Sequence, residues 1–273
     1  MQPLFYKSFA KLNLCLHILD RRKDGYHNLE SIFCPIDFYD ILSFQKNNSS
    51  KVNFKTNSNQ IDTTHNLVTK AYDVISNLYD IEGMDIFLDK KIPIGSGLGG
   101  GSSNAAVTLL ALNDIFQLDI SKESLMRISE DIGADVPFFI NGEAAYIGGK
   151  GEIINKISMQ KKYFVLVLSN LNISTKDIYE FLTSKDFMAQ YSLDELMASN
   201  VNSFEKIVMS KYPLLKETKY WLSAFGSVRM SGTGSTLYIE YDNYESALEA
   251  NKEIGQKYKS LMVSSLKSYD VFS

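Results

Sequence analysis

The chain has 273 residues, of which 45% are hydrophobic and 22% are charged, and its formal net charge is −4. This length suits one large domain or two of ordinary size, and the composition is typical of a soluble globular protein. The acidic balance argues against nucleic acid as the main ligand, and no apolar run approaches the roughly 20 residues of a membrane helix.

The N-terminus does not have the sustained apolar core of a signal peptide, because Lys7, Lys11 and Asn13 interrupt it. Cys15 and Cys34 form neither a metal-spaced cluster nor a disulfide framework. We therefore expect a cytoplasmic protein with two reduced, buried thiols, which exists as a monomer or a weak homodimer and has no membrane or nucleic-acid partner.

The first predicted element is a strand over residues 11–18, where apolar and polar side chains alternate. The residues expected on the apolar face are Leu12, Leu14, Leu16 and Ile18, and those expected on the polar face are Lys11, Asn13, Cys15 and His17. Further strands are predicted over 41–45, 52–55 and 84–88. The segment 46–64 is rich in Asn, Ser and Thr and is expected to be a surface loop around a short edge strand.

Two helices of the first half have recognisable N-caps. Asn66 is predicted to cap a helix that carries apolar residues at helical spacing, and Ser121 a helix that runs to about Ile132. In the second half, helices are predicted over 175–183, 192–198, 203–209, 214–224 and 244–258, and strands over 163–168, 227–230, 236–241 and 261–264.

Strands and helices mix without strict alternation, which favours an α+β fold over a doubly wound sheet. We expect two domains, residues 1–155 and 156–273, with the active site in the cleft between them.

A glycine-rich segment over residues 93–104 has five glycines in seven positions and leads directly into a helical run, 105–112. Glycines let an anion approach the backbone, and the first turn of a helix offers unpaired N–H groups, so this segment predicts a phosphate site. The alternative is a mobile glycine loop before an ordinary helix. The residues expected to bind ATP phosphates are Pro93, Ile94, Gly95, Ser96, Gly97, Leu98, Gly99, Gly100, Gly101, Ser102 and Ser103.

The segment departs from three familiar phosphate motifs. A Walker-type loop needs Lys and then Ser or Thr after its second glycine, whereas Gly101 and Ser102 follow Gly100 here. The dinucleotide pattern is formally met, but the strand that should follow the helix is missing. A protein-kinase loop would need a His-Arg-Asp catalytic segment, and none of the three histidines precedes Arg-Asp.

Five segments occur in a diagnostic order: 10–14 (Ala-Lys-Leu-Asn-Leu), 24–27 (Asp-Gly-Tyr-His), the loop 93–104, 133–138 (Gly-Ala-Asp-Val-Pro-Phe) and 230–234 (Met-Ser-Gly-Thr-Gly). Together they resemble the GHMP kinase superfamily and, within it, the family of 4-diphosphocytidyl-2-C-methyl-D-erythritol kinases. The resemblance covers nearly the whole chain, and Asp-Gly-Tyr-His is its most specific part. The chain departs from the family pattern at Asp20, where glycine is usual, and at Cys34, where glutamine is common.

The resemblance implies that Lys11 and Asp135 are the catalytic pair. Asp135 would accept or orient the proton of the attacking hydroxyl, and Lys11 would keep Asp135 ionised and stabilise charge on the transferring phosphoryl group. The residue pattern alone also permits a solvent-facing Lys11 and an Asp135 that only caps a helix.

The resemblance also places Asn13, Tyr26, His27 and Thr233 on the substrate side, with Tyr26 and His27 forming a cytosine pocket. Tyr179 is assigned to the other face of the base from its place after the apolar strand. Without the resemblance, Tyr26 and His27 would be an incidental exposed pair, and the second glycine loop, 231–235, a tight turn between strands.

The function so implied is transfer of phosphate from ATP, with Mg²⁺ expected, to the 2-hydroxyl of 4-diphosphocytidyl-2-C-methyl-D-erythritol in non-mevalonate isoprenoid precursor biosynthesis. No cluster of metal-binding side chains is visible, so magnesium follows from the chemistry of ATP. The alternatives are another GHMP kinase, acting on homoserine, mevalonate or a sugar, and a nucleotide-binding module without catalysis. A dinucleotide-dependent oxidoreductase is a more distant one.

Overall fold

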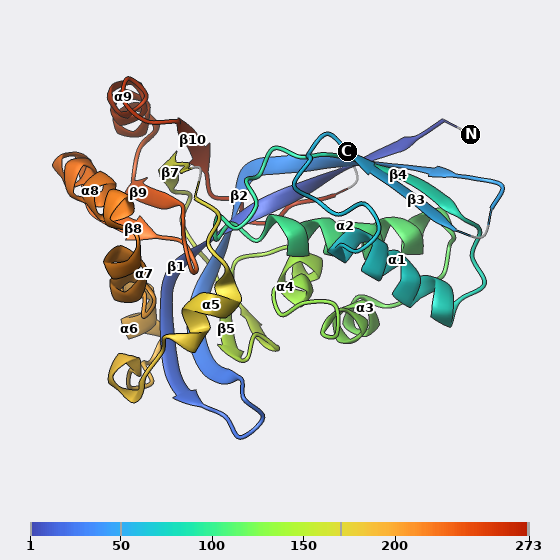
Figure 1. The fold of residues 1–273 in the computed structure, drawn as a ribbon, viewed down its shortest axis with the longest axis horizontal. Coiled ribbons are helices and arrows are strands. Elements are labelled where there is room, and N and C mark those ends of the chain that lie inside the picture. The colour runs from blue at the N-terminus through green and yellow to red at the C-terminus, as the bar shows by residue number, and fades with distance from the viewer. Residues whose placement is uncertain (1, 50, 170, 272–273) are drawn as a thin grey trace.

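Two long antiparallel strands, β1 (Leu4–Arg21) and β2 (His27–Lys46), form a hairpin that runs through the molecule (Figure 1). The computed structural model describes residues 2–49, 51–169 and 171–271. One half of β2 pairs with β4 (Met84–Asp89) and the other half with β5 (Ala145–Gly149). The hairpin thereby forms the centre of a six-stranded sheet.

The first sheet is completed by β3 (Val52–Thr56), which lies parallel to β4 at one edge, and by β6 (Ile153–Lys156), which pairs with β5. The four helices of this half lie together on one side of the sheet (Figure 1). They are α1 (Leu67–Leu78), α2 (Gly100–Ile115), α3 (Lys122–Ser129) and α4 (Val136–Asn141). Helix α2 is buried along most of its length between the sheet and its neighbours, as its Ala- and Leu-rich sequence favours.

A second, four-stranded sheet has the order β10-β7-β9-β8 and carries the remaining helices. Its strands are β7 (Tyr163–Val167), β8 (Val228–Met230), β9 (Leu237–Tyr241) and β10 (Ser260–Ser264). The helices are α5 (Thr175–Glu180), α6 (Leu193–Ala198), α7 (Glu205–Lys211), α8 (Pro213–Leu222) and α9 (Tyr244–Ile254), with short 3-10 turns at Ser184–Asp186 and Ser223–Phe225.

The α+β class is confirmed, and so are the elements whose ends carry local signals. Asn66 accepts hydrogen bonds from the amides of Val68 (2.8 Å) and Thr69 (3.1 Å), and Ser121 accepts one from Ser124 (3.2 Å). Helix α3 ends at Ser129 rather than near Ile132. The short edge strand in the polar segment 46–64 is β3.

The predicted faces of the first strand are wrong beyond Asn13. The pairing of β1 with β2 shifts register between Asn13 and Cys15, so that the extra residue forms a bulge and exchanges the two faces. Leu12 and Leu14 belong to one core cluster, whereas Leu16 and Ile18 belong to the other. The polar face is also buried, since the side chains of Lys11, Asn13, Cys15 and His17 are almost entirely inaccessible to solvent.

The sequence did not predict the first half of β2, β5 or β6, and it indicated helix α4 only as the helix that Asp135 would cap. Residues 29–36 of β2 are all buried, so both faces are apolar or internally bonded and the alternation that marks a half-exposed strand is missing.

The C-terminal segment returns to the first sheet. Leu266 donates its amide to Pro35 O (2.8 Å), Tyr269 to Gly142 O (3.2 Å), and Lys7 donates to Val271 O (3.2 Å). The C-terminal segment is therefore joined to β1, to β2 and to the end of α4.

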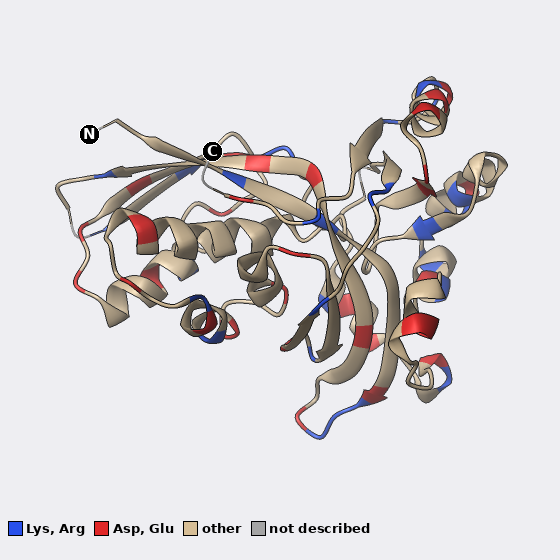
Figure 2. Cartoon of the chain, turned by 180° about the vertical axis from the view of Figure 1, so that it is seen from behind, with Lys and Arg blue, Asp and Glu red and all other residues tan. Residues whose placement is uncertain are grey.

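Figure 2 shows Lys and Arg interspersed with Asp and Glu through both halves of the molecule. Within residues 2–49, 51–169 and 171–271, every helix is too short or too polar to traverse a lipid bilayer.

Candidate active site

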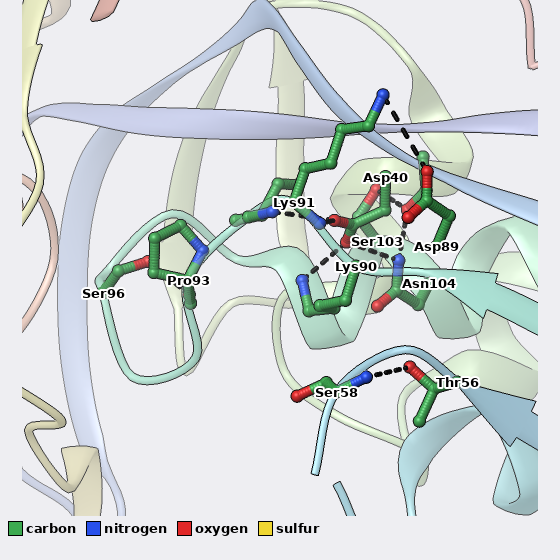
Figure 3. Close-up of polar contacts among 12 residues, drawn as sticks. Asp40, Thr56, Ser58, Asp89, Lys90, Lys91, Pro93, Ser96, Ser103 and Asn104 are labelled. Carbon is green, nitrogen blue, oxygen red and sulfur yellow. Dashed lines mark hydrogen bonds and ion pairs between the residues drawn. The ribbon is translucent and has the colours of Figure 1, made fainter. Parts of the chain in front are cut away.

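The predicted phosphate loop connects β4 to α2 and ends at the N-terminus of that helix (Figure 3). Gly99 is the N-cap residue, and its φ of +70° lies in the left-handed region that favours glycine. Ser96 donates its hydroxyl to Pro93 O (2.7 Å), and Ser96 O accepts the amide of Thr236 (3.1 Å). The loop is thus an ordered turn before the helix, fastened to the second sheet.

The two glycine loops lie against each other. Ser231 donates its hydroxyl to Gly97 O (2.9 Å), and the same hydroxyl accepts the amide of Asn13 (3.2 Å). A Cβ added at Gly97 would overlap the carbonyl oxygen of Ser231, so only glycine permits this approach. Asn202 donates to the carbonyls of Met230 (2.9 Å) and Gly232 (2.8 Å) and holds the second loop from the other side.

A cavity of about 630 Å³ opens beside the two loops and is lined by residues from both halves of the chain. Its lining includes Lys11, Asn13, Asp135, Tyr179, Thr233, Ser102 and the loop residues Pro93, Ile94, Gly95, Ser96, Gly97, Gly99, Gly100 and Gly101. Leu98 and Ser103, by contrast, lie outside the set of described residues that line it. Leu98 packs in a core cluster, and the buried Ser103 hydroxyl accepts a hydrogen bond from Ser8 (2.8 Å).

Lys11 and Asp135 meet in this cavity. Lys11 Nζ lies 3.6 Å from Asp135 Oδ2, and the lysine side chain is 4% exposed whereas the aspartate side chain is 32% exposed. The solvent-facing alternative for Lys11 is therefore wrong. Asp135 occupies the N-cap position of α4, but among the described residues its carboxylate makes no capping hydrogen bond. Its carboxylate faces Lys11 in the cavity.

The ammonium group of Lys11 is held in one orientation. It donates to Asn13 Oδ1 and to Gly97 O (3.2 Å), and it lies 4.5 Å from the centre of the Phe33 ring. Asn13 is fixed in turn, because its amide group donates to the Ser31 hydroxyl (3.2 Å). Burial lowers the pKa of Lys11 below its ordinary range, and the nearby Asp135 carboxylate opposes that shift.

The expected base pocket is only partly assembled. His27 packs between the rings of Tyr179 (5.5 Å) and Phe187 (6.0 Å), and Tyr179 also lines the cavity. Burial raises the pKa of Tyr179, whose phenol therefore stays protonated. Thr233 donates to or accepts from the Thr175 hydroxyl at 3.0 Å.

Tyr26 is not brought together with His27. Its ring is 60% exposed, lies 5.4 Å from Lys150 Nζ, and borders a separate depression beside residues 130–134. The reason is local, because adjacent residues at the start of a strand project to opposite sides.

Sequence reasoning missed several residues that shape the cavity. They are Phe33 beneath Lys11, and Phe54, Asn66, Leu88 and Lys90 at the end beyond the glycine loop. Phe187, also missed, packs on His27, and both lie outside the described residues that line the cavity. The sequence could have indicated Lys90 as a site residue, since it is a basic residue shortly before the loop. The aromatic residues had no such signal, because their apolar character predicts only a core position.

A metal site built by the protein alone is not found: the described residues contain no group of three or more His, Cys, Asp or Glu side chains that could hold an ion.

Comparison with known proteins shows the family to which the chain belongs. Residues 66–143 match the model of the GHMP kinases N terminal domain, and residues 178–260 match that of the GHMP kinases C terminal domain. A 4-diphosphocytidyl-2-C-methyl-D-erythritol kinase of Francisella philomiragia is 40% identical over 240 residues, 86% of each chain. One of Hahella chejuensis is 34% identical over 100% of this chain and 96% of its own.

Solved structures show the same relationship. A crystal structure of 4-(cytidine 5'-diphospho)-2C-methyl-D-erythritol kinase superposes with a TM-score of 0.83 at 29% identity, over 96% of this chain and 99% of the other. A homoserine kinase from Cytophaga hutchinsonii shares the fold, with a TM-score of 0.71 at 15% identity over 98% of this chain and 96% of its own. The chain therefore belongs to the GHMP kinase family, and within it to the group of the 4-diphosphocytidyl-2-C-methyl-D-erythritol kinases.

Proposed function

We propose that this protein transfers the γ-phosphoryl group of ATP to the 2-hydroxyl of 4-diphosphocytidyl-2-C-methyl-D-erythritol. Membership of a kinase family implies the use of ATP, and the names of the curated relatives indicate the acceptor. The observation that carries the proposal is the Lys11–Asp135 pair, 3.6 Å apart in a cavity that also contains the glycine loop and the N-terminus of α2.

The triphosphate is assigned to the loop and the first turn of α2. Unpaired amides at a helix N-terminus and the positive end of its dipole favour an anion, and Gly99 and Gly100 line the cavity at that point. Ser102 supplies the hydroxyl that lines the cavity there. The end of the cavity beyond the loop, between Phe54 and Leu88, is the apolar surface left for the base of the nucleotide.

The cavity fits Mg²⁺ only together with ATP. Magnesium prefers oxygen ligands and is commonly bound by one or two protein groups plus substrate phosphates and water. Ser102 and Asp135 are the residues that could approach it, since both line the cavity. When bound, the ion would neutralise charge on the phosphate oxygens.

Asp135 and Lys11 divide the work of the transfer. Asp135 takes the proton of the acceptor hydroxyl while the oxygen of that hydroxyl forms a bond to the γ-phosphorus. At the same time the bond between the γ-phosphorus and the oxygen that bridges it to the β-phosphate breaks, and ADP is released. Asn13 and the Gly97 carbonyl hold Lys11 in place, and Lys11 stabilises the negative charge on the transferring phosphoryl group. The acceptor side of the cavity contributes Thr233 and Tyr179, with His27 behind the tyrosine ring.

An assay of ADP release tests the acceptor directly. The cytidine-linked methylerythritol should give turnover, whereas mevalonate and homoserine at equal concentration should give less than about one fifth of it, because stacking of a base on aromatic rings is worth ~1–3 kcal/mol and is unavailable to them. If mevalonate or homoserine is turned over as fast as the cytidine-linked methylerythritol or faster, the proposed acceptor is wrong. If none of the alcohols tried gives ADP release, only a nucleotide-binding module without catalysis would remain.

A further inference from the structure

Asp40, in the second half of β2, is a fully buried carboxylate that the proposed mechanism does not use. Its Oδ1 accepts the amides of Lys91 (2.7 Å) and Ile92 (2.8 Å). Its Oδ2 accepts Lys90 Nζ (2.6 Å) and Asn104 Nδ2 (2.9 Å). Figure 3 shows Asp40 between Lys90, Lys91 and Asn104.

The four donors come from the two ends of the glycine loop. Residues 90–92 lead out of β4 into the loop, and Asn104 lies in the second turn of α2, directly after it. One carboxylate on a central strand therefore fastens both ends of the loop to the sheet. The distance between those ends decides how the loop amides are presented to the cavity.

A second buried contact supports the end at α2. Ser8, on the neighbouring strand β1, donates to the Ser103 hydroxyl (2.8 Å) and accepts from Asn104 Nδ2 (2.8 Å). Ser8, Ser103 and Asn104 are all buried. At the start of α2, Ser103 and Asn104 thus hold the helix in place, while Ser102 lines the cavity.

Asp40 also sets the position of Lys90. The lysine side chain is 7% exposed, and its ammonium group would lie 2.8 Å from a Cβ added at Gly100, the first residue of α2. Burial lowers the pKa of Lys90, and the Asp40 carboxylate opposes that shift and holds the amine beside the helix N-terminus. Lys90 lines the cavity, whereas Asp40 lies outside the set of described lining residues.

We propose that Asp40 is a positioning residue of the nucleotide site, which holds both ends of the glycine loop and Lys90 in the arrangement that receives the triphosphate. It acts through Lys90, Asn104 and the amides of residues 91–92 and does not touch the nucleotide. This inference rests on the proposed binding of ATP at the loop.

The test is Asp40→Asn, studied without and with a non-hydrolysable ATP analogue. The asparagine side chain keeps the shape of the aspartate and one acceptor oxygen, but it places an NH₂ group where the second oxygen accepted hydrogen bonds. Hydrogen exchange of residues 90–104 without nucleotide should accelerate, and the Kd of the analogue should rise at least about tenfold, because buried donors lose their acceptor. The KM of the alcohol acceptor and kcat at saturating ATP should change less than about threefold, since the acceptor side keeps its contacts.

Two controls separate positioning from loss of stability. Asp37→Asn changes a carboxylate on the same strand that accepts from the Ser264 amide and hydroxyl, away from the loop. Ile254→Ala opens a cavity under α9 in the second half and lowers overall stability. Both should leave loop exchange and the Kd of the analogue within about twofold of the parent.

Parent-like loop exchange and affinity in a folded Asp40→Asn protein would overturn the inference. If that variant does not fold, Asn104→Ala releases only the end of the loop at α2, and the same two readouts decide. If the parent itself fails to bind the analogue, the proposed nucleotide site is wrong, and the hydrogen-exchange comparison still decides whether Asp40 orders the loop.

Discussion

The two ends of the cavity that we assign to the phosphates and to the acceptor are built differently. At the phosphate end, Lys11, Asn13 and Asp40 are buried and each makes several hydrogen bonds or ion pairs to backbone or side chains. At the acceptor end, the aromatic residues contact one another through ring packing, and Tyr26 is largely exposed. We therefore expect the first end to be fixed before ligands bind, and the ring packing at the second end to adjust when a substrate enters.

This contrast has a physical reason. Charge development during phosphoryl transfer is stabilised only by groups that are already oriented, which requires buried and fully bonded partners. Recognition of a base by stacking needs apolar surface and tolerates adjustment of the rings. Substitutions at the two ends should therefore differ in both size and kind.

The largest effect is expected for Asp135→Ala. Loss of the proton acceptor should lower kcat by about 1,000-fold, while binding of an ATP analogue stays close to that of the parent. Steady-state kinetics and calorimetry measure the two quantities. The exposed Asp131→Ala, four residues earlier, is the control. Turnover within tenfold of the parent would remove Asp135 from the mechanism.

Gly97→Ala should disrupt the phosphate end through backbone strain and overlap with Ser231 O. We expect a loss of about 2–4 kcal/mol in the free energy of unfolding and a higher KM for ATP. Urea unfolding and kinetics provide the measurements. Gly25→Ala is a matched control, since Gly25 also has positive φ but a Cβ there meets nothing within 4 Å. If Gly25→Ala costs as much stability, the contact between the loops is unimportant.

His27→Ala should affect the acceptor end alone. Removing the ring that packs on Tyr179 and Phe187 should raise the KM of the cytidine substrate by about tenfold, from ~1–3 kcal/mol of lost stacking and packing. The KM of ATP should stay within twofold. The exposed Tyr220→Ala on α8, outside the described residues that line the cavity, serves as control. Equal changes in both KM values would contradict the separation of the two ends.

Tyr26→Ala sharpens the same comparison. Because Tyr26 stands outside the cavity beside Lys150, we expect the acceptor KM to rise only about threefold in the conformation described here. The control is Tyr220→Ala on α8, whose side chain is 83% exposed. A rise as large as that of His27→Ala would show instead that the hairpin turn folds onto the bound substrate.

The smallest expected effect is on the pH dependence of stability, through His17 in β1. His17 is buried between Glu30 (3.2 Å) and Ser199 (2.8 Å), and burial lowers its pKa below the usual value. The unfolded chain therefore takes up a proton first as pH falls below about 6.5, so stability that is complete above this pH declines below it, by less than about 1.4 kcal/mol per pH unit.

Thermal unfolding at pH 7.5 and 5.5 measures this decline. It should be smaller in His17→Gln than in the parent, whereas His65→Gln, at an exposed histidine, should decline as the parent does. An unchanged difference between the two pH values in His17→Gln would show that other groups cause it.

The sequence by itself determined the family, the α+β class, the capped helices and the place of the glycine loop. These features depend on short-range signals: cap residues, glycine spacing, and a lysine and an aspartate inside recognisable motifs. The alternation around Lys11 also predicted a strand correctly, although it could not show that its polar face is buried.

Only the tertiary structure decided which side chains meet. The bulge after Asn13 exchanges the faces of β1, and it leaves Lys11 and Asn13 on the cavity side while directing His17 away from it. The contacts of Asp40 with residues 90–92 and 104, and of Gly97 with Ser231, join segments many residues apart. Periodicity reports the neighbours of a residue along the chain, whereas these contacts arise from strand register and packing, which a single sequence does not encode locally.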